Sequence, residues 1–336
     1  MKTLFSRLAL AAAVVAGLAA APVAKAQETT VKVGYAKCAH CVPMSLLPDY
    51  TQGVKVEAIG FNTGNDVLTA LVSKSIDVAQ VTYLHYVTGL DKGFDLVAIS
   101  GQISGGSTIV VANDLPLPEN DWAALKALIA SYKAQGKPFR VAASRGNAQD
   151  IHMRGALAKQ GIDVNKDVQF INIPNPSDHI QALRRGEVEM ICTVEPFATQ
   201  ILQAKAAKLF AYPYDQAAGK LTNLIVTRSD VIAKEPKAVA AVVKGVVALD
   251  EKLDADHVLW QGVITKVTGL DKSVADGAII NLYPDYKMHR AQAAAIADMM
   301  RDLKYINTDV TKKVEDNMNY TFLEQATGKS KSDLGY

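Results

Sequence analysis

Short apolar stretches and amphipathic stretches alternate along most of the chain. The apolar stretches are rich in Val, Ile and Ala and have the length of buried β-strands. They lie at residues 31–35, 54–59, 77–81, 96–100, 108–112, 139–143, 168–173, 188–193 and 224–227. Residues 66–73, 149–160 and 176–185, which lie between them, have helical character. Strands that alternate with helices predict an α/β protein with largely parallel sheets.

The pattern changes near residue 230, after which the chain is mostly helical in character to about residue 320. Residues 238–253 carry apolar side chains at helical spacing, and Pro236 suits a helix start, where its missing N–H costs little. Earlier in the chain, residues 70–78 and 182–190 share one pattern: a helix end, a tight turn and a buried strand. Two similar halves predict two lobes rather than one continuous sheet.

The first 26 residues have the layout of a cleavable signal peptide. Lys2 and Arg7 precede an apolar run at residues 8–20, and Ala24-Lys25-Ala26 forms a small-x-small cleavage pattern. The apolar run is too short to span a bilayer comfortably. No cysteine follows the cleavage position, so no lipid anchor is expected. We therefore expect a soluble mature chain that begins at Gln27 and works in a bacterial periplasm.

The charge of the mature chain excludes one class of partner. The formal net charge of the full sequence is +2, and three of its positive charges, at Lys2, Arg7 and Lys25, lie in the leader, which has no acids. The mature chain is therefore close to neutral, at −1, with no long basic run. This gives no support for nucleic-acid binding.

Four segments together resemble one family of transport proteins. They lie at residues 31–35, 75–79, 186–197 and 225–236. In order and spacing they are similar to the periplasmic substrate-binding proteins of ABC importers for nitrate, alkanesulfonates and taurine, which include binders of a thiamine-precursor pyrimidine. The resemblance implies an α/β, two-lobed periplasmic-binding-protein fold of type II. Parallel-rich sheets flanked by helices would enclose a ligand in the interlobe cleft.

The resemblance also implies a domain layout and a mechanism. Lobe 1 is expected at residues 27–113 and 222–336, including the helical tail, and lobe 2 at residues 114–221. Crossovers are expected near residues 113–138 and 212–222. A monomeric receptor of this kind closes about its hinge on a small solute and docks on the ABC permease at the inner membrane. It has no enzymatic activity and no cofactor.

Candidate ligand-binding residues are those at strand ends and helix starts, where α/β proteins place their sites. They are Tyr35, Cys38, His40, Asn62, Thr63, Thr82, Tyr83, His85, Ser107, Thr108, Gly146, Asn147, Ala148, Gln149, Asn175 and Glu195. Of these, Asn147-Ala148-Gln149 lies at a helix start, where free N–H groups and the helix dipole favour an anion. A simple capping turn is the alternative interpretation.

Glu195 points to the chemistry of the ligand. In the family, an acidic residue at this Glu-Pro position often lies at the cleft. A carboxylate there would repel a bare anion and favour a ligand with a cationic or N–H group, which predicts an amino-sulfonate such as taurine, or a nitrogen heterocycle, over nitrate. A structural ion pair is the alternative role. An aromatic or heterocyclic solute also remains open, because Tyr35, Phe61, Tyr83 and Tyr86 could offer ring faces.

The tetrad Cys38-Ala39-His40-Cys41 departs from the family pattern. It allows a disulfide that stiffens the first cleft loop, a redox-active pair, or a soft-metal or zinc site that uses both thiolates and His40, with or without His85. A single CxxC lacks the second pair that would make a zinc motif specific. The tetrad could also serve an enzyme, as in cytosolic relatives of the pyrimidine binders. The export signal and the lack of a clear nucleophile–base pairing argue against an enzyme.

Three further residues are expected to be structural. Cys192 lies within a predicted strand and is expected to be a buried, small apolar residue. His152 and His179 lie in predicted helices and are expected at the surface or at helix caps.

Overall fold

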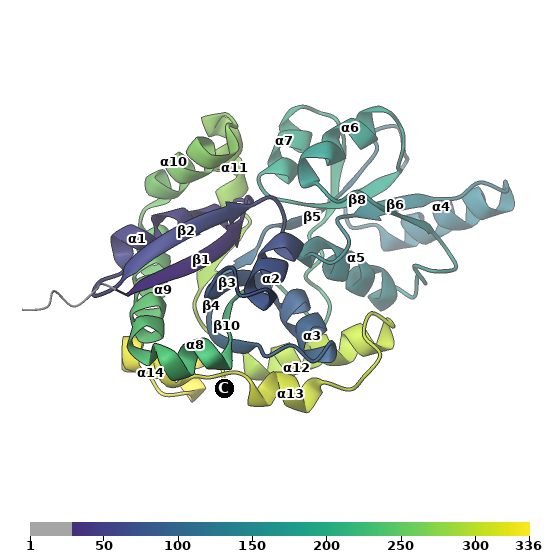
Figure 1. Cartoon of the computed structure of the whole chain (residues 1–336). Helices are drawn as coiled ribbons and strands as arrows, with labels where there is room; N and C mark the ends of the chain where they lie inside the picture. The colour runs from purple at the N-terminus through teal and green to yellow at the C-terminus, as the bar shows by residue number, and fades with distance from the viewer. Residues whose placement is uncertain (1–28) are drawn as a thin grey trace, which may run out of the picture.

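The computed structural model describes residues 29–336, so the expected signal peptide at residues 1–26 lies outside the described residues. The chain forms two lobes, each built on its own β-sheet with helices on both faces (Figure 1). This is the two-lobed α/β architecture expected from the sequence. Among the described residues, no helix is both long enough and apolar enough to cross a bilayer.

Lobe 1 is built on a six-stranded sheet with the strand order β11-β4-β10-β3-β1-β2. Its strands are β1 (Thr30–Ala36), β2 (Lys55–Phe61), β3 (Val78–Thr82), β4 (Val97–Gly105), β10 (Asn223–Thr227) and β11 (Leu282–Asp285). Its helices are η1 (Val42–Leu46), α1 (Leu47–Tyr50), α2 (Gly64–Val72), α3 (Tyr83–Asp91), α8 (Ser229–Lys234), α9 (Pro236–Ala255), α10 (His257–Thr268), α11 (Lys272–Ile279), α12 (Arg290–Asp302), α13 (Thr311–Asp316), α14 (Thr321–Thr327) and η3 (Ser332–Leu334).

Lobe 2 is built on a five-stranded sheet with the strand order β7-β6-β8-β5-β9. Its strands are β5 (Ser107–Val111), β6 (Arg140–Ala143), β7 (Gln169–Asn172), β8 (Met190–Val194) and β9 (Lys208–Ala211). Its helices are α4 (Trp122–Ala134), α5 (Ala148–Lys159), η2 (Pro176–Asp178), α6 (His179–Arg184) and α7 (Phe197–Gln203).

Both sheets are mixed rather than largely parallel. β1 pairs in parallel with β2 and β3, whereas β10 runs antiparallel to both β3 and β4. In lobe 2, β5 runs antiparallel to β8 and β9. β5 and β10 each enter their sheet directly from the opposite lobe. They do not follow the crossover helix that would return the chain in the parallel direction.

The first crossover lies at Gly105 and Gly106, because β4 ends at Gly105 in one sheet and β5 begins at Ser107 in the other. Both glycines have positive φ, 89° and 85°, which side chains with a Cβ rarely adopt. The expectation of a crossover near residues 113–138 was therefore wrong, and that segment holds α4 instead. Two glycines between two apolar strands resemble an ordinary turn, so the pattern did not mark the boundary. The return crossover lies between Ala211 and Asn223, where residues 212–222 were expected.

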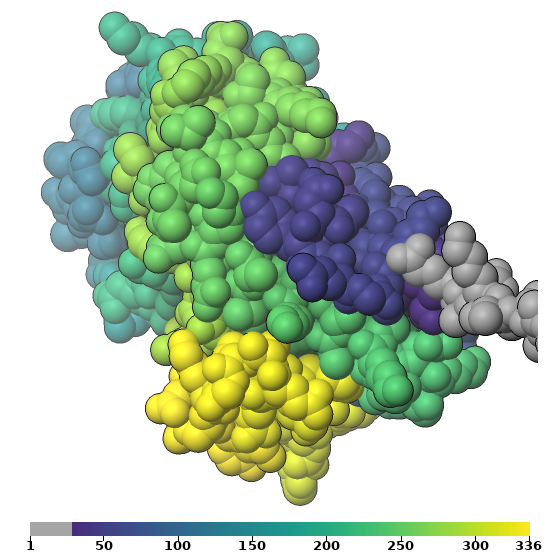
Figure 2. All heavy atoms as spheres, turned by 90° about the vertical axis from the view of Figure 1, so that its left-hand side faces the viewer, coloured from purple at the N-terminus to yellow at the C-terminus, as the bar shows by residue number. Residues whose placement is uncertain are grey.

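The helical tail packs on lobe 1, as expected. α9 buries Val239, Val242 and Val246, which lie three and four residues apart on one face. The C-terminal residues, yellow in Figure 2, lie against the green segment that contains α9. One strand interrupts the tail: β11 adds to the edge of the lobe 1 sheet by pairing with β4.

Each lobe has its own apolar core. In lobe 2, alternate residues of β5 and β8 point to opposite faces of the sheet, as strand geometry requires. Ile109 and Cys192 belong to the cluster on one face, and Val110 and Ile191 to the cluster on the other. Cys192 is fully buried and has a free thiol, as expected for a small apolar residue in a strand.

Candidate functional site

A cavity of about 520 Å³ lies between the two lobes. Both lobes contribute to its wall, mainly through strand ends and the turns that follow them. From lobe 1 it is lined by Ala36, Lys37, Cys38, His40, Cys41, Asn62, Thr63, Gly64, Gln80, Val81, Thr82, Asn223, Val267 and Thr268. From lobe 2 it is lined by Ser144, Asn147, Ala148, Gln149, Asn175, Pro176, Ser177, Val194 and Phe197.

The cavity brings together residues that were predicted from five separate parts of the chain. Those that line it are Cys38, His40, Asn62, Thr63, Thr82, Asn147, Ala148, Gln149 and Asn175. They come from both lobes, so closure of the lobes places all of them around one space. The other candidates, Tyr35, Tyr83, His85, Ser107, Thr108, Gly146 and Glu195, do not line this cavity.

Three of the lobe 1 candidates point into the protein. Tyr35 belongs to the lobe 1 core, and the Tyr83 hydroxyl donates a 2.6 Å hydrogen bond to the carbonyl of Met288. His85 lies behind Thr82, with Nδ1 2.8 Å from the Thr82 Oγ1 and Nε2 3.2 Å from Asn65 Oδ1. His85 therefore positions Thr82 from behind instead of facing the cavity itself.

Ser107 and Thr108 directly follow the first crossover between the lobes. Ser107 Oγ lies 2.8 Å from Nδ1 of His152, and the Asn281 side-chain amide donates to the Ser107 carbonyl and to Thr108 Oγ1. The Tyr214 hydroxyl lies within hydrogen-bond distance of both backbone groups of Ser107. These contacts occupy the Ser107 and Thr108 hydroxyl groups, which were predicted to bind the ligand.

His152 and His179 are fully buried, so the expectation that they lie at the surface was wrong. Each uses both ring nitrogens in hydrogen bonds, to Ser107 and Leu221 and to Thr193 and Ile173, respectively. Burial lowers the pKa of each to about 4. Both histidines lie on helix faces that pack against the sheets, and the local sequence does not show this.

Glu195 faces away from the cavity. Its side chain is buried, and Oε2 accepts a 3.0 Å hydrogen bond from the backbone N–H of Thr199, in the first turn of α7. Burial raises the pKa of Glu195 to about 7. The carboxyl group acts as a helix cap, because it accepts from one of the N–H groups that have no partner within α7. The sequence-based argument for an amine-bearing ligand therefore loses its basis.

Helices α2, α3 and α5 each start at the cavity, and they differ in how their free N–H groups are satisfied. α2 and α3 each have a capping box, formed by Thr63 with Asp66 and by Thr82 with His85. α5 begins after Asn147, whose side chain makes no capping hydrogen bond with any described residue. The first N–H groups of a helix have no partner inside it, so the start of α5 is free to bind an anion.

The charges around the cavity also favour an anion. None of its lining residues is an aspartate or glutamate, and Lys37 contributes a positive charge. Asp150, in the first turn of α5, is already neutralised by Arg154 through a 2.8 Å ion pair. The rest of the wall combines amide and hydroxyl groups with the apolar side chains of Val81, Val194 and Phe197.

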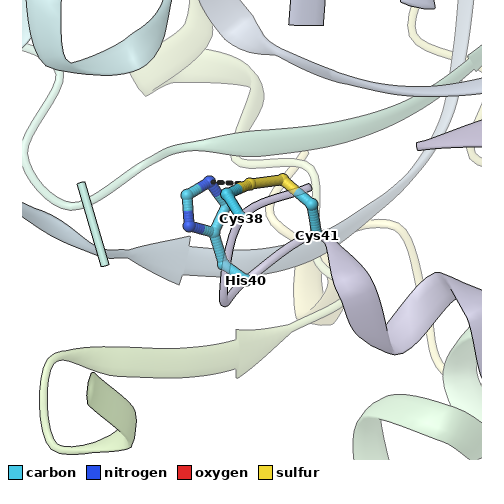
Figure 3. Close-up of side chains that lie close together, drawn as sticks. All are labelled: Cys38, His40 and Cys41. Atoms are coloured by element: carbon cyan, nitrogen blue, oxygen red, sulfur yellow. Dashed lines mark hydrogen bonds between the residues drawn. A yellow bond between two sulfur atoms is a disulfide. The ribbon is translucent and has the colours of Figure 1, made fainter. Parts of the chain in front are cut away.

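The tetrad forms a sulfur-rich part of the wall. Cys38 and Cys41 are joined by a disulfide, and His40 Nε2 lies 3.3 Å from the Cys38 sulfur (Figure 3). The sequence left a disulfide, a redox-active pair and a metal site open for this tetrad. The structure contains the disulfide, which closes the first cleft loop. One ligand atom from each of Cys38, His40 and Cys41 lies within 4.8 Å of the others. His85, which was considered as a further ligand, is bonded to Thr82 and Asn65 instead.

Several cavity residues were not on the list of candidates. Gln80 and Asn223 lie in apolar strands, and a polar side chain in an otherwise apolar run could have marked them. Ser144 directly follows β6 and could have been found in the same way. Thr268, at the end of α10, carries no local signal, because only the packing of the tail brings it to the cavity.

The two lobes contact each other directly at two places. The Ala39 N–H donates to the Glu195 carbonyl at 3.0 Å, which joins the tetrad loop to lobe 2. Gln203, in α7, donates from its side chain to the Ser273 carbonyl at 2.9 Å, which joins α7 to α11. These contacts describe a closed arrangement of the lobes.

Comparison with known proteins gives one family. The sequence model described as "NMT1-like family" matches residues 24–259, more than half of the chain. The nitrate/nitrite binding protein NrtA of Synechococcus elongatus is 30% identical over 123 residues, which are 36% of this chain and 28% of that protein. The aligned segment thus spans less than a third of the relative.

Two solved structures share the fold. The alkanesulfonate-binding protein SsuA from Xanthomonas axonopodis pv. citri, bound to MOPS, superposes with a TM-score of 0.71 and 19% identity, covering 88% of this chain and 100% of that one. The periplasmic nitrate-binding protein NrtA from Synechocystis has a TM-score of 0.79 and 17% identity, covering 92% of this chain and 91% of that one. At these identities the likeness concerns the fold.

Proposed function

The chain belongs to the NMT1-like family, and on that basis we propose that it is the solute-binding receptor of an ABC importer for an alkanesulfonate-like organic anion. It binds and releases its solute without converting it. Hinge closure about Gly105 and Gly106 encloses the solute, and the closed protein then docks on a permease. This proposal keeps the exported, monomeric receptor that was expected from the leader sequence and the family resemblance.

The observation that carries the proposal is the free start of α5 in a cavity wall without carboxylates. Backbone N–H groups and the helix dipole together favour a negatively charged group at Asn147, Ala148 and Gln149. Removal of water on closure strengthens these contacts. The similar proteins named above bind nitrate or an alkanesulfonate, both of which are anions.

The size of the cavity favours an organic anion over nitrate. Nitrate has about the volume of two water molecules, each of which takes up roughly 30 Å³. It would therefore fill only a small part of the cavity. A cavity of about 520 Å³ is in the range that holds small organic ligands. The sulfonate group would bind at α5, and the alkyl chain would contact Val81, Val194 and Phe197. Because Glu195 faces away, taurine has no advantage over an alkanesulfonate without an amine.

An aromatic or heterocyclic solute, the alternative from the sequence, has less support. Tyr83 and Tyr86 are buried and bond to the carbonyls of Met288 and Val314. Tyr35 packs in the lobe 1 core, and Phe61 does not line the cavity. Among the described residues, Phe197 is the one Phe, Tyr or Trp ring in the wall, which is too few for the stacking that this alternative needs.

Titration calorimetry of the mature protein with ethanesulfonate, taurine and nitrate tests the proposal. We expect ethanesulfonate and taurine to bind with similar affinity and nitrate to bind much more weakly. Tight binding of nitrate alone would replace the organic anion with an inorganic one. No heat with any anion, together with binding of a neutral heterocycle, would overturn the proposal.

A further inference from the structure

Anion binding at α5 does not account for the cluster formed by Cys38, His40 and Cys41. All three residues line the cavity, and one ligand atom from each lies within 4.8 Å of the others. Two thiolates and one imidazole are a ligand set that zinc uses when it keeps a fourth position open. We propose that the reduced form of this cluster binds a thiophilic metal ion of the Zn²⁺ type in the cavity wall.

The other buried histidines of the chain show how this protein satisfies an imidazole. His152 has Nδ1 2.8 Å from Ser107 Oγ and Nε2 3.3 Å from the Leu221 carbonyl. His85 and His179 also have polar partners at both ring nitrogens. Each of these side chains is therefore fully used in holding the fold together.

His40 is the exception. It is 3% exposed, yet Nδ1 has no hydrogen-bond partner within residues 29–336, and Nε2 faces only the Cys38 sulfur at 3.3 Å. A sulfur is a weak acceptor, and a buried polar group without a good partner needs an explanation. A neutral imidazole carries one nitrogen lone pair, which a metal ion can use. A metal ion bound to Nε2 would replace the weak contact with the Cys38 sulfur by a strong ligand bond.

The loop that carries the cluster is held in place by its neighbours. The Gln80 side-chain amide donates to the His40 carbonyl at 3.1 Å, and the buried Trp260 Nε1 donates to the Ala39 carbonyl at 3.0 Å. The Cys41 N–H closes a tight turn onto the Cys38 carbonyl at 2.8 Å. A ligand set supported in this way costs little to organise when a metal binds.

Disulfide and metal are alternative states of the same two sulfurs. A dithiol reductant breaks the Cys38–Cys41 bond: two electrons and two protons pass to the cysteine sulfurs, and the reductant becomes a disulfide. Binding of Zn²⁺ then releases both thiol protons, because thiolates are the ligands. The metal therefore binds only the reduced chain and protects the two cysteines from oxidation.

Metal titration of the two redox forms tests the proposal without any organic solute. Mature protein without an affinity tag is reduced with dithiothreitol, desalted under anaerobic conditions and titrated with Zn²⁺ against a chromophoric chelator. We expect one Zn²⁺ per reduced chain and none in the oxidised chain. With Co²⁺, the reduced chain should show the sulfur-to-metal charge-transfer absorption of thiolate ligation. Equal metal uptake by the two forms would overturn the proposal, and this comparison needs no variant.

Variants then assign the ligands. Cys38→Ser and His40→Gln should each weaken Zn²⁺ binding by roughly 100-fold or more, beyond the loss expected for a supporting residue. The matched controls are Cys192→Ala, which removes the thiol outside the cluster, and His257→Gln, which removes an exposed histidine. Unchanged Zn²⁺ binding in Cys38→Ser would also overturn the proposal. Sulfonate binding is measured separately on the oxidised protein, so failure of one proposal leaves the other standing.

Discussion

The phenol of Tyr305, in lobe 1, donates a 2.8 Å hydrogen bond to the carboxylate of Asp150, in lobe 2. Asp150 is fully buried and also accepts from the Gly146 N–H at 3.0 Å and from Arg154 Nε at 2.8 Å. Gly146 directly precedes Asn147 at the free start of α5. One carboxylate thus connects the contact between the lobes to the turn that is proposed to hold the anion.

Tyr305→Phe should weaken solute binding by accelerating dissociation. The substitution keeps the ring near Arg154 but removes a hydrogen bond to a charged group, which is worth about 1.5–3 kcal/mol. Because the bond joins the lobes, the loss falls on the closed state, and we expect an affinity roughly tenfold weaker. Stopped-flow dissociation and calorimetry measure the effect. Tyr132→Phe, in α4, is the control, and an unchanged dissociation rate in Tyr305→Phe would mean that this contact does not stabilise closure.

Asn147→Asp should abolish most of the anion affinity without unfolding the protein. Asp and Asn are equally good at the start of a helix, so α5 should keep its stability. The added negative charge occupies the place proposed for the sulfonate and should cost about 2 kcal/mol or more, roughly a 30-fold loss of affinity. The exposed Asn165→Asp adds the same charge away from the cavity. Equal affinities of the two variants would remove α5 from the site.

The pattern of apolar and polar positions predicted most of the fold. Nine of the strands lie where apolar runs predicted them, because a buried strand needs a continuous apolar stretch. The short edge strands β9 and β11 were missed, since neither is a continuous apolar run: Lys208 begins β9, and Pro284 and Asp285 end β11. The first crossover was missed because it depends on the φ angles of Gly105 and Gly106, and a pattern of residue types does not reveal backbone angles.

The site was predicted in part, and the reason lies in side-chain direction. Thr82 and Asn147 could be placed at the cleft because the ends of strands and starts of helices meet there. Glu195 and His85 lie close to the cavity along the chain, but each bonds to its own helix start. The position of a residue in the sequence can show that it lies near a site. Whether its side chain faces that site depends on the other hydrogen-bond partners within reach.

Glu195→Gln should stabilise the protein at alkaline pH and have little effect near pH 5. Burial raises the pKa of Glu195 from 4.5 to about 7, so the folded state holds a proton that the unfolded state releases. The wild-type protein therefore loses stability as the pH rises from about 4.5 through 7, by about 3 kcal/mol in total. Gln resembles the protonated acid and avoids this loss. Urea unfolding at pH 5 and pH 8 measures the difference.

The exposed Glu187→Gln serves as the control for Glu195→Gln, because Glu187 makes only a surface ion pair, with Arg185. The buried histidines act in the opposite direction. Their pKa values are lowered, so their stability contribution is present above pH 6.5 and is lost as the pH falls toward 4. Both glutamate variants contain the same buried histidines. Comparing Glu195→Gln with Glu187→Gln therefore cancels the pH dependence that the histidines contribute. A stability gain of Glu195→Gln that is the same at both pH values would contradict the proposed protonation.

Gly106→Ala should be more destabilising than the same change at another glycine with positive φ. Gly106 and Gly136 have φ values of 85° and 68°, so alanine at either position costs about 1–2 kcal/mol of backbone strain. At Gly136 the new methyl group meets nothing within 4 Å, whereas at Gly106 it would lie 2.8 Å from Nδ1 of the buried His40. We therefore expect Gly106→Ala to lose about 1 kcal/mol more than Gly136→Ala in urea unfolding.

Only Gly106→Ala should also weaken solute binding, because it lies at the crossover between the lobes. Equal losses would mean that His40 moves freely, and its position at the hinge would then not be fixed by packing.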